Sequence, residues 1–311
     1  MSDTAERIDA GARADRLKGV TCVLVGAALW GASGTLTKLL KLHGFDIYDI
    51  LAWRYFIGFL ALTGLAAVFF EVPTFRADLR RLRPALLLAL CMFGVNAAFT
   101  WSNFFTTVAN AIALSFTAPL FAAVLAWALL GEKIRGSHRL AIAIGVGGVA
   151  VFAFGAAGVS GASQAVLSPN IPLGNMLALL SGFLFGWYFV FARKYAQRDG
   201  AVLSATIWQF LLLSVLLVPL LPLAFFKAIP INGYLILAAY AGLCTAAPIL
   251  LLNLSGLYLK AHESSVLALT EIPFSILIGM ITLGEYPSLL SWSGVTLILI
   301  AGGLASLKQR G

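Results

Sequence analysis

The chain has 311 residues, of which 60% are hydrophobic and only 11% are charged, and its formal net charge is +8. A soluble domain of this length needs far more charge to cover its surface. Because the apolar residues are spread along nearly the whole chain, the composition excludes a water-soluble fold and indicates a protein solvated by lipid. The three cysteines lie inside apolar runs, and no spacing typical of a disulfide framework or a metal site is present.

The predicted elements are apolar helices, since a bilayer core is crossed by about 20 apolar residues in helical conformation. Residues 1–17 are polar and are predicted to form a disordered cytoplasmic tail, and the Gly/Ser/Ala/Pro-rich residues 158–172 are predicted to be a linker. The ten predicted spans are residues 18–40, 49–70, 84–106, 109–130, 137–157, 173–195, 201–226, 233–259, 262–283 and 288–307.

The basic residues are distributed unequally between the two sides of these spans. With a cytoplasmic N-terminus, 17 of the 21 Lys and Arg fall on the cytoplasmic side, and Lys38, Lys41 and Lys227 fall outside. This distribution follows the positive-inside rule and predicts that both termini are cytoplasmic. It also explains the net positive charge by anionic lipid, without a nucleic-acid partner.

The chain repeats its own pattern. The fourth span ends in Gly131-Glu132-Lys133, and the ninth ends in Gly284-Glu285. Further correspondences pair Trp30-Gly31 with Phe185-Gly186, Lys38 with Arg193, and Gly147-Gly148 with Gly302-Gly303. Five spans per half is an odd number, so the two halves insert with opposite orientation. The predicted fold is an all-α membrane protein with ten transmembrane helices, built from two inverted five-helix repeats over residues 18–157 and 173–307. Inverted repeats are typical of secondary transporters that bind substrate near the membrane midplane.

These motifs resemble the EamA-type family of the drug/metabolite transporter superfamily. The resemblance rests on Trp30-Gly31, on the stretch from Pro119 to Gly131-Glu132-Lys133, and on its counterpart ending in Gly284-Glu285. One departure is Ile272, which stands opposite Pro119, so that the second proline is displaced by one position. The resemblance implies two inverted five-helix halves that move amino acids or other metabolites. Among bacterial members, the chain most resembles amino-acid exporters of the YddG type.

Glu271 is the most informative single residue. It lies near the middle of the ninth span, where an acid costs about 2.5–3.5 kcal/mol to insert. We expect it to contact a substrate ammonium group or to bind a coupling proton; the alternative is a protonated acid hydrogen-bonded within the bundle. Arg54 in the second span either snorkels to the interface or contacts a substrate carboxylate.

A polar stripe in the third span is formed by Asn96, Thr100 and Asn103, with Trp101 beside it. Such a stripe either joins helices or faces a water-filled cavity. Pro119 and Pro273 lie in the first halves of their helices, and each frees a backbone carbonyl one turn upstream. Such a carbonyl either lines a cavity or accompanies a simple kink. The predicted substrate-binding residues are Trp30, Ser33, Asn96, Thr100, Trp101, Pro119, Trp187, Asn253, Glu271 and Pro273, with Glu271 also the coupling candidate.

Rival functions are a scaffold or receptor and, more remotely, an intramembrane serine protease. Gly31-Ala32-Ser33-Gly34 resembles the Gly-x-Ser-Gly of rhomboid proteases, but Ser33 and the candidate base His262 are predicted at different depths. No ATP-binding motif is present, and no metal or other cofactor is expected. The function predicted is a secondary transporter of the bacterial inner membrane that exports aromatic and other neutral amino acids by alternating access; the alternative is export of other small metabolites or drugs. The expected partners are a small-molecule substrate and the lipid bilayer, and we take the chain as a monomer.

Overall fold

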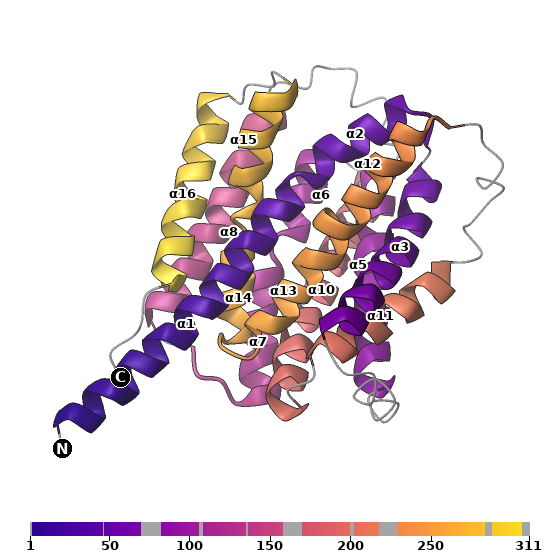
Figure 1. The fold of residues 1–311 in the computed structure, drawn as a ribbon. Helices are drawn as coiled ribbons and strands as arrows, with labels where there is room; N and C mark the ends of the chain where they lie inside the picture. The colour runs from indigo at the N-terminus through magenta and orange to yellow at the C-terminus, as the bar shows by residue number, and fades with distance from the viewer. Residues whose placement is uncertain are drawn as a thin grey trace.

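The computed structural model describes residues 2–45, 47–69, 82–105, 108–134, 136–157, 170–199, 202–217, 229–283 and 288–306, and all regular structure in these ranges is helical (Figure 1). The helices pack side by side, and α1 begins and α16 ends at the same end of the bundle. The elements of the first half are α1 (Ser2–Gly31), α2 (Ser33–Leu42), α3 (Ile47–Phe69), α5 (Leu82–Phe105), α6 (Val108–Ser115), α7 (Ala118–Leu130) and α8 (Gly136–Ala157). Those of the second half are α10 (Ile171–Asp199), α11 (Val202–Leu217), α12 (Ile231–Ala241), the π-helical turn η4 (Gly242–Ala246), α13 (Ala247–Ser255), α14 (Ala261–Ala268), α15 (Glu271–Leu283) and α16 (Leu289–Ser306).

Four helical segments are long and apolar enough to cross a membrane by length and composition: 136–155, 172–196, 231–255 and 261–282. Five shorter apolar helices, of 10–17 residues, accompany them in the described part of the chain. All of these helices fall on predicted spans. The total of ten crossings and the opposite orientation of the halves stay predictions.

The structure differs from the sequence prediction at the N-terminus. Residues 1–17 are predicted to be disordered, whereas α1 continues back to Ser2. Arg16 gives a physical reason for order near the first span, because it donates hydrogen bonds to the Glu263 side chain at 3.0 Å and to the Ala305 carbonyl at 2.8 Å. Most of the predicted linker, residues 158–169, and the Gly284-Glu285 motif lie outside the described residues.

Besides the first span, which is interrupted at Ala32 between α1 and α2, two predicted spans are broken in the middle rather than kinked. The helix of the fourth span stops at Ser115 and resumes at Ala118, with Pro119 in its first turn, where a missing N–H removes no intrahelical hydrogen bond. The ninth span stops at Ala268 and resumes at Glu271. At each break a threonine hydroxyl bonds a carbonyl three residues earlier, from Thr117 to Leu114 and from Thr270 to Leu267. The repeat therefore preserves the break although its prolines are one position out of register.

The Trp30-Gly31 and Phe185-Gly186 motifs of the two halves pack in equivalent places. A Cβ on Gly31 would lie 2.8 Å from the Ser275 backbone nitrogen and 2.9 Å from the Phe274 Cβ. A Cβ on Gly186 would lie 2.9 Å from the Ala122 backbone nitrogen and 2.7 Å from the Phe121 Cβ. Each glycine thus allows a helix of one half to touch the broken helix of the other half.

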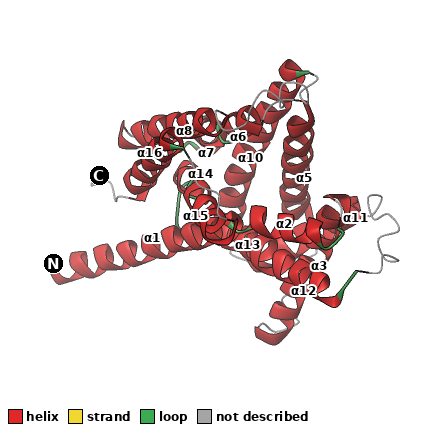
Figure 2. Cartoon of the chain, turned by 90° about the horizontal axis from the view of Figure 1, so that it is seen from above, coloured by secondary structure: helices red, strands yellow, loops and turns green. Residues whose placement is uncertain are grey.

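Helices α8 and α16 pack closely along one edge of the bundle (Figure 2). Small residues allow backbones to approach in membrane proteins, and the glycines of the fifth and tenth spans are predicted to serve this purpose. Gly145 and Gly148 do so, since an added Cβ would meet neighbouring atoms at 2.8 Å and 2.9 Å. Gly147 and Gly303 face open space, so for these two the prediction is wrong.

Gly148→Ala is expected to destabilise the protein, because its Cβ would press on the Gly294 carbonyl at 2.9 Å and the Ile298 nitrogen at 3.0 Å. Overpacking costs about 1–3 kcal/mol. Thermal unfolding of the detergent-purified variant should show a lower melting temperature. Gly147→Ala, one position earlier on the same helix with nothing within 4 Å, is the matched control. Equal melting temperatures for both variants would contradict the close α8–α16 packing.

Candidate functional site

A cavity of about 370 Å³ lies between the two halves. It is lined from α1, α2, α3, α5, α6, α10, α12, α13 and α15 and from η4, so both repeats contribute to its wall. The helix breaks shape it directly, since Ser115 and Phe116 precede one break and Glu271 follows the other. The π-helical turn adds Cys244 and Thr245 to the wall. A volume of this size is in the range of small-molecule sites, about 300–1,000 Å³.

Arg54 is held on the cavity wall by neutral groups. Its guanidinium donates to the Tyr240 hydroxyl at 3.1 Å, the Tyr55 hydroxyl at 2.8 Å and the Asn96 side-chain oxygen at 2.6 Å. Asn96 in turn donates to the Tyr55 hydroxyl at 2.8 Å and to the Met92 carbonyl at 2.7 Å. No acidic side chain forms an ion pair with Arg54 among the described residues, and its Nε is buried without a hydrogen-bond partner there. The network fixes the cation in place but leaves its charge uncompensated.

Glu271 faces the same cavity as the first residue of α15. The backbone N–H groups and the dipole of a helix N-terminus favour a carboxylate there. Within the described part of the chain no side chain forms an ion pair or hydrogen bond with Glu271. The cavity therefore carries one basic and one acidic side chain that are not paired with each other.

Aromatic rings form much of the remaining wall, from Trp30, Phe99, Phe116 and Phe185. Trp30 packs edge-on against Phe185 with ring centroids 6.1 Å apart, which joins the two Trp/Phe-Gly motifs of the repeat across the molecule. Such rings offer flat apolar surface with specific edge and face contacts.

The structure brings four of the predicted site residues to the cavity: Trp30, Ser33, Asn96 and Glu271. The side chain of Thr100 lies outside what the structure describes. The remaining five predicted residues do not line this cavity, and they are Trp101, Pro119, Trp187, Asn253 and Pro273.

The aromatic and proline residues among these five lie outside the cavity wall for different reasons. Trp101 is 54% exposed and stacks on Phe105. Trp187 packs between the rings of Phe183 and Phe191 on another face of α10. Pro119 and Pro273 are buried in the first turns of their helices. They shape the breaks without presenting atoms to the cavity.

Asn253 is instead the centre of a buried network within the second half. It accepts a hydrogen bond from the Tyr188 hydroxyl at 2.9 Å and donates to the Thr206 hydroxyl at 2.9 Å and to Gln209 at 3.3 Å. These four side chains come from α10, α11 and α13. The amide thus joins three helices, which is the other expected role of polar side chains in membrane helices.

Sequence reasoning did not single out Tyr55 and Tyr240, which hold Arg54, or Thr245 on the π-helical turn. One signal was available, because Tyr55 directly follows Arg54 in the sequence and its ring can cover the guanidinium. The Arg54 Cζ lies 4.6 Å from the centroid of the Tyr55 ring. Tyr240 comes from the opposite half, and nothing local in the sequence joins it to Arg54.

The protease alternative is not favoured by this placement. Ser33 lines the cavity, whereas His262 contacts Glu132 at 3.7 Å and the ring of His138 at a centroid distance of 5.0 Å. The two residues belong to separate groups of side chains.

His138, His262 and Glu263 could in principle ligate a metal ion, since each offers one ligand atom and these atoms lie within 4.8 Å of one another. However, Glu263 already contacts Arg16 and His138 at 3.0 Å each and accepts a hydrogen bond from the Lys260 backbone nitrogen at 3.0 Å. The carboxylate is therefore satisfied by protein groups, and a cation would have to lie beside the Arg16 guanidinium.

Comparison with known proteins decides the family. The pattern of the EamA-like transporter family matches the chain twice, over residues 17–154 and 172–307. The chain belongs to the EamA-like transporter family. It is a multi-pass membrane protein, and both halves of the repeat are family units.

An uncharacterized transporter of Archaeoglobus fulgidus is 25% identical to this transporter over 294 residues, which covers 94% of this chain and 97% of that one. A riboflavin transporter of Rhizobium johnstonii is 31% identical over 258 residues and covers 80% of this chain and 76% of that one. A solved crystal structure of 16% sequence identity superposes with a TM-score of 0.71 and covers 94% of this chain and 96% of that chain. The last likeness shows that the fold is shared.

Asn253→Leu is expected to lower the melting temperature of the transporter, because it leaves the buried Tyr188, Thr206 and Gln209 side chains with unsatisfied groups. The cost of such groups is about 1–3 kcal/mol each. The stabilisation by a bound substrate should be unchanged, since Asn253 does not line the cavity. Thermal shift measured with and without substrate checks both points, and a loss of the substrate shift at normal stability would place Asn253 in the binding site.

Proposed function

We propose that this protein is a secondary transporter that exports amino acids, aromatic and other neutral ones, through the central cavity by alternating access. The cavity lies between the two family units, and transporters built from inverted repeats bind substrate at such a place. We further propose that it works as a monomer in the bacterial plasma membrane with both termini in the cytoplasm, in line with the distribution of Lys and Arg.

One observation carries this proposal: the cavity wall presents Arg54 and Glu271, each without an oppositely charged partner among the described residues. Isolated charges inside a membrane are costly unless they are paired. A zwitterion would offset both, with its carboxylate on Arg54 and its ammonium group on Glu271. Arg is suited to a carboxylate because its planar fork can bind both oxygens.

The aromatic walls support a substrate with an apolar or aromatic side chain. Trp30, Phe116 and Phe185 would contact that side chain, and the family relationship supports transport of a small molecule rather than catalysis.

A second candidate substrate is a flat polycyclic metabolite. Two observations favour it: one relative, 31% identical, is named a riboflavin transporter, and the cavity of about 370 Å³ has several aromatic rings in its wall. Such a substrate would stack on the rings and would need Arg54 only as a hydrogen-bond donor.

Arg54→Gln separates these candidates. For a zwitterionic amino acid it should raise the KM of uptake into proteoliposomes by about 10–100-fold, because a hydrogen bond to a charged group is worth about 1.5–3 kcal/mol. Arg54→Lys, which keeps the charge but not the fork, should lose less. Labelled amino acids and a flavin form the panel. Saturable flavin uptake with no amino-acid uptake, in vesicles shown to hold folded protein, would refute the amino-acid proposal and favour the second candidate.

Glu271→Gln tests coupling. If the carboxyl binds the coupling proton, the variant should no longer concentrate substrate under an imposed pH gradient but should still exchange labelled for unlabelled substrate downhill. The comparison is made in the same vesicles with the gradient on and collapsed. Gradient-driven accumulation by the Gln variant at the parent rate would end this assignment.

A further inference from the structure

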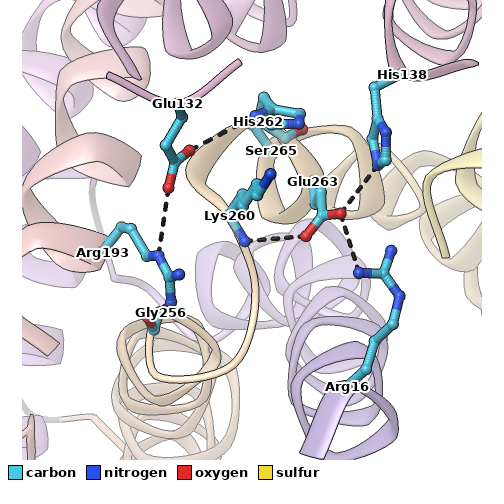
Figure 3. A network of polar contacts seen from close by, with 9 residues as sticks. All are labelled: Arg16, Glu132, His138, Arg193, Gly256, Lys260, His262, Glu263 and Ser265. Carbon is cyan, nitrogen blue, oxygen red and sulfur yellow. Dashed lines mark hydrogen bonds and ion pairs between the residues drawn. The ribbon is translucent and has the colours of Figure 1, made fainter. Parts of the chain in front are cut away.

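A second group of charged side chains lies at the end of the bundle where α1 begins and α16 ends, away from the cavity (Figure 3). We call it the terminus-side cluster. It consists of Arg16 on α1, Glu132 after α7, His138 on α8, Arg193 on α10, and His262 and Glu263 on α14.

The contacts of the cluster form two connected sets. In the first, Glu132 lies 3.5 Å from the Arg193 Nε and 3.7 Å from the His262 Nδ1, and Arg193 also donates to the Gly256 carbonyl. In the second, one oxygen of Glu263 lies 3.0 Å from Arg16 and 3.0 Å from the His138 Nε2. The edge-on contact of the two histidine rings joins the sets.

Every one of these ion pairs connects the two halves of the repeat. Arg16, Glu132 and His138 belong to the first half, and their partners belong to the second. By contrast, the nearby pair Lys18–Asp15 at 2.8 Å lies within α1, and both of its side chains are more than half exposed. The inter-half pairs are therefore a distinct set and not a general feature of this end of the molecule.

The cluster is also buried. The exposed fraction of its side chains is 1% for His262, 5% for Glu263 and 11% for Glu132, and all residues of α14 are buried. Desolvation makes buried ion pairs poor contributors to stability compared with apolar packing, and their best-attested use is to fix one arrangement against another. Movement of the two halves relative to each other would have to separate all of these pairs.

We propose that the terminus-side cluster is a latch: it closes the terminus side of the transporter in this conformation, and it must separate before the cavity can open on that side. The proposal rests on the proposed alternating access. It deepens that function by naming the residues that set the balance between the two open states. A ligand or variant shifts such a balance only by its different effect on the two states.

The test reads solvent access to the cavity from each side and needs no substrate. In a background with Cys22, Cys91 and Cys244 replaced by Ser, the variant Ser33→Cys places one thiol on the cavity wall. The full-length protein is reconstituted with known orientation, and a membrane-impermeant maleimide is added to one face at a time. With the latch intact, we expect labelling from the face opposite the termini and little from the terminus side.

The latch is then opened by the double variant Glu132→Gln with Arg193→Gln, which removes both partners and so leaves no unpaired charge between them. Labelling from the terminus side should rise by about tenfold or more, as expected when a two-state balance is shifted. The charge swap Glu132→Arg with Arg193→Glu restores a pair and should return labelling toward the parent rate. The matched control, Asp15→Asn with Lys18→Gln, removes an ion pair at the same end that does not join the halves, and it should change nothing.

Unchanged labelling in the double variant, with the melting temperature of the parent, would overturn the latch. If the double variant fails to fold, the charge swap decides: parent-like labelling together with restored folding is expected, and a terminus-side rate about tenfold or more above that of the parent would overturn the proposal. Because labelling does not depend on substrate identity, a transporter that moves no amino acid leaves this test intact. Conversely, a result that overturns the latch leaves the uptake predictions for Arg54 and Glu271 standing.

Discussion

The structure depends on the requirement that backbone polar groups inside a membrane find partners within the protein. Besides the short interruption at Ala32, two helices end and restart in mid-span, and at each of these two breaks a threonine hydroxyl donates to a carbonyl three residues earlier that also accepts a backbone N–H, Thr117 to Leu114 and Thr270 to Leu267. Only because these groups are satisfied can the chain expose irregular backbone beside a cavity. The residues next to the breaks, including Glu271, consequently face the cavity rather than the lipid.

The terminus-side end of the bundle and the central cavity treat charge in opposite ways. At the terminus side, acids and bases from different halves are paired and buried. In the cavity, Arg54 is held by a tyrosine and amide network and Glu271 lies at a helix N-terminus, so each charge is supported by dipoles but not neutralised. A site that keeps its charges fixed but uncompensated is prepared for a ligand, whereas a set of paired charges resists separation.

Position along a helix could be argued from the sequence more readily than direction around the helix. The repeat, the family and the cavity role of Trp30, Asn96 and Glu271 could be argued from position along the spans. Whether a side chain faces the cavity could not be argued in general because, apart from the stripe that contains Asn96 on the third span, the helices are apolar on nearly all sides and have no polar face to orient them. Asn253 shows the difficulty, since its amide suits a cavity wall equally well but lies in a network with Tyr188.

Broken helices were also beyond the sequence argument. Pro119 predicts a local disturbance, but a proline alone does not distinguish a kink from a complete break. The equivalent break before Glu271 occurs although Ile272 stands where the first half has its proline. What the two sites share is a threonine whose hydroxyl donates to the carbonyl three residues earlier, and this feature is visible only when the coordinates show both bonds.

The two halves of the repeat match in their packing contacts but not in all of their charged residues. The tight contacts made by Gly31 and Gly186 are equivalent in both halves. The charges are equivalent only in part: Glu132 and Arg193 correspond to Glu285 and Lys38, whereas at an offset of 153 residues Glu263 corresponds to Asn110 and His262 to Ala109. The Arg16–Glu263–His138 set therefore has no charged counterpart on Asn110 in the first half. In the proposed alternating access, unequal ends would make one conformation preferred when the cavity is empty, and a substrate that neutralises the cavity charges would alter that preference.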